Sequence, residues 1–268
     1  MSVKIKIGII GYLPFHFNKK LIKKWKSNEF EIIDDIQEQQ FMKNADIDPK
    51  YFNMSSGIKL HYSWGYSDSL LKEETDAVEG NSEKADFSIW ITFVPLKDNY
   101  FVRRLSSNRV VLSYFEMYDI LKKELIPVEN LLLRTIYRHI LIFYKYRNSI
   151  PSHESTPNIP FIHDDTRGCL FDMCANKADV VFFLNKPEIC KHCEIGITRD
   201  DDDTERVGEN RVKQIRKECS EKIKRGSYYK IVGFIKEKPI PSLILSTLFG
   251  ILLDLIATVI YNLLIKLK

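Results

Sequence analysis

Four of the five cysteines in this chain lie in one segment, residues 167–193, where they form two close pairs. The pairs are Cys169 with Cys174 and Cys190 with Cys193, in a C-x4-C-x15-C-x2-C pattern. Because each pair supplies two thiolates from one turn, the spacing is typical of a tetrahedral zinc site. Four protein ligands leave no open position for water, so the predicted zinc is structural.

Two histidines compete with these cysteines for the metal. His163 can replace Cys174 if that cysteine faces the core, which gives a site of one histidine and three cysteines. His192 lies inside the C-x2-C turn, where its side chain is expected to point outward. The sequence therefore leaves the fourth ligand open between Cys174 and His163.

The composition predicts a folded protein with no particular charged partner. Hydrophobic residues make up 44% of the 268 positions, and the formal net charge is only +4, so no nucleic-acid partner is expected. The amino-terminal apolar run contains Lys4 and Lys6 and lacks a cleavage site, which indicates a strand rather than a signal peptide. We therefore expect a reducing compartment, where clustered cysteines bind metal more often than they form disulfides.

The pattern of apolar and polar segments predicts an α/β fold with a single mixed sheet. The expected elements are strands at residues 3–12, 30–34, 85–96 and 108–117, the last two pairing or lying side by side, and helices at 18–26 and 127–147. A proline-rich loop at 151–163 leads into the cysteine segment, in which residues 178–184 are expected to form a short strand. A charged helix is expected at 204–225.

Residues 243–265 contain a single ionisable group, Asp254, and predict a helix of about 34 Å, enough to cross a bilayer. A buried core helix is the alternative. Lys230, Lys236 and Lys238 precede this segment and, by the positive-inside rule, place the amino-terminal part in the cytoplasm. The chain is thus divided into a zinc-binding domain at 1–198, a charged helix and linker at 199–238, and a single-pass carboxy-terminal transmembrane helix at 239–268.

Small or polar residues recur every fourth position along this helix, with Ser246, Gly250 and Asp254 near its middle. Such spacing lets helices approach closely in lipid, and a charge near the bilayer midplane favours a partner helix or water. We therefore expect a homo-oligomer formed through this face. A plain anchor with tolerated polar residues is the alternative.

The cysteine pattern and the order of elements resemble those of archaemetzincins, over roughly residues 1–197. In that family a helical HExxHxxGxxH motif binds a catalytic zinc, and a C-x4-C and a C-x2-C that follow bind a second, structural zinc. The resemblance implies that Cys169, Cys174, Cys190 and Cys193 hold the structural zinc.

The catalytic motif of that family has no full counterpart here. His153, Glu154 and His163 stand at its first, second and eleventh positions, but prolines occupy the positions of the second histidine and the glycine. Pro157 and Pro160 make the required helix implausible. The core helix at 127–147 carries only His139, which is interpreted as a packed core residue. The sequence therefore indicates a metzincin-type scaffold that kept its structural zinc and lost its catalytic one.

Two smaller groups of residues have chemical potential. Asp164, Asp165 and Asp172 surround Arg167 and form either a carboxylate site or, more commonly, loop caps and ion pairs. Cys219 lies on the charged helix without a neighbouring base and is interpreted as a small apolar filler.

Two functions fit these features. The first is a tail-anchored, non-enzymatic protein whose cytosolic zinc-bound domain senses an unknown protein or small-molecule ligand and controls an oligomerising membrane helix, as a stress or defence effector does. The alternative is a membrane-anchored divergent zinc metallopeptidase, or another hydrolase, that uses His153, Glu154 and His163.

Overall fold

The computed structural model describes residues 2–40, 65–76, 85–201, 204–224 and 227–266. These residues divide into two compact units, Met1–Lys224 and Arg225–Lys268. The first unit holds the sheet and the cysteines, and the second holds the hydrophobic helix.

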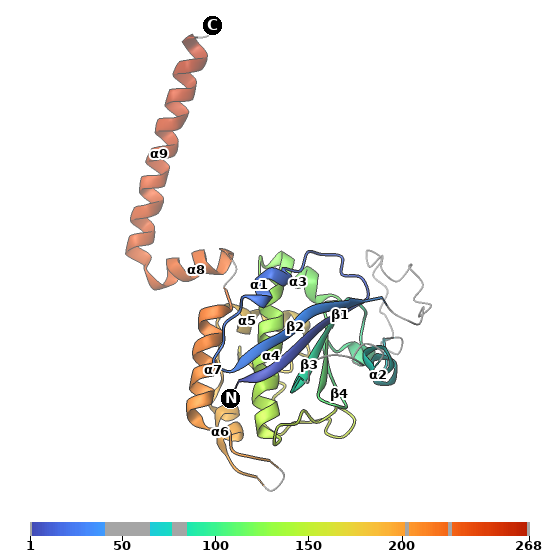
Figure 1. Ribbon diagram of the computed structural model, residues 1–268. Coiled ribbons are helices and arrows are strands. Elements are labelled where there is room, and N and C mark those ends of the chain that lie inside the picture. Colours follow the sequence, from blue (N-terminus) through green and yellow to red (C-terminus); the bar gives the residue numbers. More distant parts are fainter. Residues whose placement is uncertain (1, 41–64, 77–84, 202–203, 225–226, 267–268) are drawn as a thin grey trace. The chain divides into compact units, whose positions relative to one another are not determined.

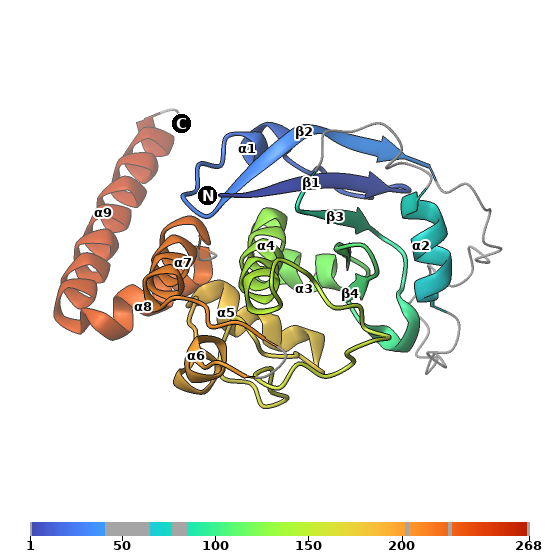
Figure 2. The same cartoon turned by 60° about the horizontal axis from the view of Figure 1, so that its bottom comes forward.

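A five-stranded mixed sheet forms the centre of the first unit (Figures 1 and 2). Its strands, in spatial order, are β2 (Phe30–Gln39), β1 (Val3–Ile10), β3 (Phe87–Thr92), β5 (Arg109–Ser113) and β4 (Val102–Leu105). The first four strands run parallel, whereas β4 pairs antiparallel with β5 at one edge. The predicted mixed-sheet α/β class is confirmed, including the pairing of the two strands expected as neighbours. The short edge strand β4 was not predicted.

The central strands are buried on both faces, which explains their continuous apolar sequences. Side chains alternate along β3, so that Phe87 lies 5.9 Å from Phe143 of helix α4 (Val128–Lys145), measured between ring centroids. Trp90 points to the opposite face and packs in one cluster with Leu71 of helix α2 (Asp68–Asp76). The sheet therefore lies between α4 and α2.

Glycine at position 8 is required by this packing. A Cβ placed on Gly8 of β1 would lie 2.2 Å from the Trp90 ring, much closer than any real contact. The "GIIGY" run at the start of the chain is thus explained by a strand that makes room for a large aromatic side chain on the next strand.

Shorter helices surround this core. They are α1 (Lys19–Lys23), α3 (Met117–Lys123), α5 (Val180–Asn185), α6 (Lys191–Thr198) and α7 (Glu209–Lys222). The strand predicted at 178–184 is wrong, because a 3-10 turn at Lys177–Asp179 runs directly into α5 there. Val180, Val181, Phe183 and Leu184 are buried, so the apolar run belongs to a short core helix, which periodicity alone does not distinguish from a strand.

Helix α7 packs along α4 within the first unit. The Tyr137 hydroxyl of α4 donates a 2.8 Å hydrogen bond to Glu218 of α7, and the Arg211 guanidinium lies 3.7 Å from the centre of the Tyr144 ring. The charged helix predicted at 204–225 thus forms part of the first unit.

The second unit contains α8 (Ser227–Glu237) and α9 (Pro239–Lys266). Residues Pro239–Thr258 form a helix long and apolar enough to cross a membrane, with a mean hydropathy of 2.1, and none of this stretch is buried within the structure. Large apolar side chains such as Leu248, Leu252 and Leu255 are exposed along it. The predicted hydrophobic carboxy-terminal helix is confirmed.

Candidate metal centre

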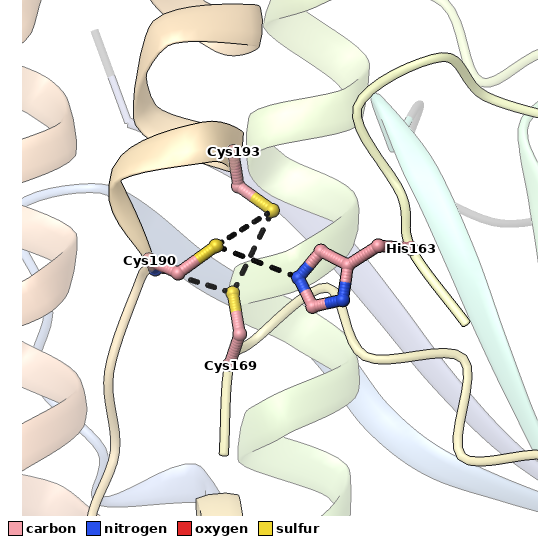
Figure 3. Close-up of side chains that lie close together, drawn as sticks. All are labelled: His163, Cys169, Cys190 and Cys193. Atoms are coloured by element: carbon pink, nitrogen blue, oxygen red, sulfur yellow. Dashed lines mark hydrogen bonds between the residues drawn. The ribbon is translucent and has the colours of Figure 1, made fainter. Parts of the chain in front are cut away.

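Four metal-ligating side chains converge in the first unit: His163, Cys169, Cys190 and Cys193 (Figure 3). One ligand atom from each residue lies within 4.8 Å of all the others, and only Cys190 is partly exposed. The sulfur–sulfur distances are 3.7 Å between Cys169 and Cys193 and 3.5 Å between Cys190 and Cys193. The Nε2 atom of His163 lies 3.5 Å from the Cys190 sulfur.

These distances match the edges of a zinc tetrahedron. With zinc–sulfur bonds of about 2.3 Å and a zinc–nitrogen bond of about 2.0 Å, two sulfurs lie about 3.8 Å apart and a sulfur and a nitrogen about 3.5 Å apart. The cluster therefore fits a zinc site, as the sequence predicts. Three thiolates and one imidazole complete a four-coordinate shell, so the metal is structural.

Local backbone structure brings the cysteines together. Cys190 is the N-cap of α6 and Cys193 lies in its first turn, so the C-x2-C pair occupies one helical turn. Cys169 comes from a loop that turns sharply at Gly168, whose φ is +71°. This loop runs beside the approach to α6, because the Leu170 amide donates to the Glu188 carbonyl.

The His163 ring is oriented by its second nitrogen. Nδ1 lies 2.8 Å from the Asp165 carbonyl oxygen and 3.4 Å from the carboxylate of the buried Asp172. An Nδ1 proton donated to these oxygens leaves the Nε2 lone pair facing Cys190 and the cluster. This arrangement fixes the tautomer that a zinc-bound histidine needs.

Hydrogen bonds also prepare the Cys169 sulfur to act as a thiolate. The pKa of this thiol is lowered to about 5, first by a hydrogen bond with the Cys193 sulfur and then by the backbone N–H groups of Cys190 and Phe171. Those two N–H groups lie 3.3 Å and 3.5 Å from the sulfur. A thiolate is the form that binds metal.

Asp172 and Arg167 hold the loop around the metal rather than form a separate carboxylate site. One oxygen of Asp172 accepts hydrogen bonds from the backbone N–H groups of Cys169 and Arg167, at 2.9 Å and 3.1 Å. The Arg167 side chain pairs with Asp165 at 2.6 Å and reaches the Cys190 sulfur at 3.8 Å. Asp164 is exposed. The loop-cap interpretation describes these contacts.

Cys174 lies outside the cluster, contrary to the expectation that all four clustered cysteines bind one metal. Its backbone has a φ of +54°, and its buried sulfur lies 3.6 Å from a guanidinium nitrogen of Arg134 and 3.6 Å from the Asp172 carbonyl oxygen. Burial raises the pKa of this thiol. His163, the alternative ligand, occupies the fourth corner.

The residues proposed for a catalytic zinc do not gather in the structure. His163 belongs to the cysteine cluster, whereas the exposed Glu154 and the partly buried His153 lie in the proline-rich loop. His139 is buried in α4, where its Nδ1 bonds the Thr135 carbonyl and burial lowers its pKa to about 3. Cys219 is buried in α7 outside the cluster.

Two arginines of the core helix, Arg134 and Arg138, also contact the loop that carries Asp172. Nitrogens of both side chains donate to the Asp172 carbonyl oxygen, at 2.7 Å and 3.2 Å. The sequence signal for these two residues is their four-residue spacing within a largely apolar helix. This spacing places two cations on one helix face.

No protein-family profile and no curated protein sequence matches this chain. The chain is similar to the crystal structure of an archaemetzincin from Methanopyrus kandleri, with 11% sequence identity and a TM-score of 0.36, over 74% of this chain and 97% of the other. Archaemetzincins are the family that the cysteine pattern resembles.

Proposed function

We propose that this protein is a membrane-anchored, non-enzymatic sensor or interaction protein. Its first unit, held together by a structural zinc, binds a partner or ligand and controls the association of α9 in the membrane. The amino-terminal unit lies on the cytoplasmic side, and α9 is the single-pass anchor. A stress or defence effector is the kind of protein that uses such an arrangement.

The observation that carries this proposal is the exposed apolar surface of α9. The hydrophobic stretch at Pro239–Thr258 has no part buried within the structure, and this supports a membrane-spanning helix over a core helix. Exposed apolar area on this scale is stabilised by lipid or by another protein. Lys230, Lys236 and Lys238 are exposed just before the apolar stretch or at its start, where the negatively charged cytoplasmic surface of a bilayer favours them.

The non-catalytic role of the first unit is supported by the ligand shell. Three cysteines and His163 occupy all four positions of a tetrahedral zinc, so no site remains for a water nucleophile or a substrate carbonyl. The peptidase alternative needs His163 as a ligand of a second zinc. That role conflicts with its position in the cluster.

We expect Glu154→Gln to leave zinc content, melting temperature and any hydrolytic background unchanged. Glu154 is exposed in its loop, and exposed substitutions of this kind alter stability by about 0.5 kcal/mol or less. Metal analysis should give one zinc per chain. Two zinc ions per chain, one of them lost with His153→Ala, or peptidase activity that disappears in Glu154→Gln, would support the metallopeptidase instead.

The membrane proposal is tested by extraction and by crosslinking. The full chain, expressed in cells, should stay in the membrane pellet after washing with alkaline carbonate, whereas release into the supernatant would end the membrane claim. For association, Gly250→Leu should reduce crosslinking between copies severalfold while insertion persists, because leucine adds bulk where a second helix approaches and keeps the helix apolar.

The structure makes Gly250→Leu a clean test of association. Nothing lies within 4 Å of a Cβ built on Gly250, so the substitution disturbs no contact within the described chain. Leu252→Phe adds bulk on roughly the opposite side of the helix and serves as the matched control. Asp254→Leu removes the costly charge, so it should improve insertion and weaken association. Undiminished crosslinking in both Gly250→Leu and Asp254→Leu would show that α9 is a plain anchor.

A further inference from the structure

A cleft of about 700 Å³ borders the metal centre at His163. Its walls are β4, helix α4, the proline-rich loop and the segment at residues 173–175. A volume of this size suits a small-molecule ligand. The charged side chains of its walls indicate what kind of molecule that is.

Cationic groups in and behind this cleft lack acidic partners. Arg104 of β4 and Arg138 of α4 line it, and Arg134 lies one turn before Arg138. Within the part of the chain that the structure describes, the hydrogen bonds of Arg104 go to the carbonyls of Pro151, Thr156 and Pro157. Arg138 donates only to the Asp172 carbonyl. Neutral carbonyls satisfy single N–H groups but carry no charge, so these contacts give Arg104 and Arg138 no carboxylate partner. The sulfurs of Cys174 and Cys169 favour the charged form of Arg138, and Arg134 also donates to the Cys174 sulfur.

The burial of Arg134 makes the lack of a carboxylate partner energetically unfavourable. Its side chain is fully buried, and its Nε and Nη1 atoms have no hydrogen-bond partner among the described residues. A buried guanidinium without a counter-ion is strongly unfavourable, so a second charge nearby requires compensation. The three guanidiniums also repel one another, since Arg134 and Arg104 both lower the pKa of Arg138 after burial, to about 9.

The acidic residues of the cleft do not neutralise this charge. Asp98 pairs with Arg103 at 3.2 Å, and Asp164 is exposed. His139 is uncharged near neutral pH because burial lowers its pKa to about 3, so it adds no further repulsion. A dianionic group that enters the cleft therefore meets three guanidinium groups, Arg138 with Arg134 and Arg104 close by, for which no carboxylate partner is present among the described residues.

The aromatic side chains of the cleft suit an organic group attached to that anion. Tyr100 and His153 both line the cleft, with ring centroids 5.5 Å apart, and Phe101 lies beside them in its wall. Planar rings of this kind stack on heterocycles or cover apolar groups.

We propose that this cleft binds a phosphate-bearing small molecule, with the phosphate at Arg138 and the organic part against Tyr100 and His153. A phosphate monoester carries nearly two negative charges at neutral pH and accepts paired N–H groups from a guanidinium, which a single carboxylate matches less well. This inference rests on the proposed sensing role, for which it supplies the class of ligand.

Binding is tested with the full-length, zinc-loaded protein in detergent micelles, titrated by calorimetry with adenosine 5′-monophosphate and with inorganic phosphate. Saturable binding of the nucleotide, competition by phosphate, and no binding of adenosine are expected. Arg138→Met should weaken nucleotide binding about tenfold or more and Arg138→Lys less, because lysine keeps the charge but not the paired donors. The exposed Arg206→Met is the matched control and should bind like the parent.

Three outcomes would overturn the proposal: no saturable binding of either probe, unchanged affinity in Arg138→Met, or equal binding of glutarate, a dicarboxylate. Zinc content is measured in every variant. If Arg138→Met loses its metal, the parent protein provides the test instead. At equal ionic strength, chloride must compete with the nucleotide for the parent protein less well than phosphate does. Carbonate extraction, crosslinking and zinc content do not depend on these titrations, so failure here is distinguishable from failure of the membrane proposal.

Discussion

Replacing Cys190 with serine is expected to leave the protein without zinc and its first unit unfolded. Structural zinc supplies folding free energy on the order of 10 kcal/mol, comparable to the whole stability of a typical domain of about 5–15 kcal/mol. Cys190 contacts both Cys193 and His163 in the cluster, so its loss opens two edges of the ligand shell. Metal analysis and thermal unfolding by circular dichroism measure the result.

The matched control is Cys219→Ala. Cys219 is a buried thiol in α7 that lies outside the cluster, so this variant should keep one zinc and lose only the modest stability of a small core truncation. Chelation of the parent should reproduce the Cys190→Ser unfolding. A Cys190→Ser protein with normal metal content and melting behaviour would remove the zinc cluster from this account.

His163→Ala and Cys174→Ala are expected to differ sharply in metal affinity. His163 supplies the fourth donor atom of the cluster, and its loss should weaken zinc binding by more than about 100-fold, the upper range seen for residues that only support a ligand. Cys174→Ala should retain one tightly bound zinc. Competition with a colorimetric chelator measures both affinities.

If Cys174→Ala loses zinc affinity and His163→Ala keeps it, the zinc site consists of four cysteines instead. In that case the Cys174 sulfur would leave its contact with Arg134 and bind the metal. His163→Cys distinguishes a lost ligand from a lost packing contact, because a new thiolate at that position can rescue zinc binding if the geometry permits, whereas His163→Gln cannot.

Much of the fold follows from local sequence signals. The strands β1, β3 and β5 and the helix α4 are predictable because most of their residues are buried and their apolar residues recur in runs. The edge strand β4 is not evident from the sequence because two of its four residues are Arg103 and Arg104. Arg103 pairs with Asp68 and Arg104 donates to the Pro151 carbonyl, and both contacts exist only in the folded chain. The segment 178–184 was misassigned because a short buried helix and a short buried strand have the same apolar composition.

The metal site was predictable in type but not in its last ligand. The spacing of Cys190 and Cys193 places both in one turn, which local geometry alone specifies. The choice between Cys174 and His163 depends on a bridge between His163 and Asp172 and on the left-handed backbone at Cys174. Both are properties of the folded loop, so spacing could not decide between them.

The contact between α7 and the zinc loop has a consequence for the reach of the chain. Arg216 of α7 donates to the Ile189 carbonyl and to Glu194, on either side of the Cys190–Cys193 turn, so the order of α7 is thermodynamically linked to the metal. The 14 residues of α7 span about 21 Å as a helix and up to about 46 Å as an extended chain. If loss of zinc unfolds α7 together with the rest of the first unit, the tether between the sheet and the hydrophobic helix becomes longer.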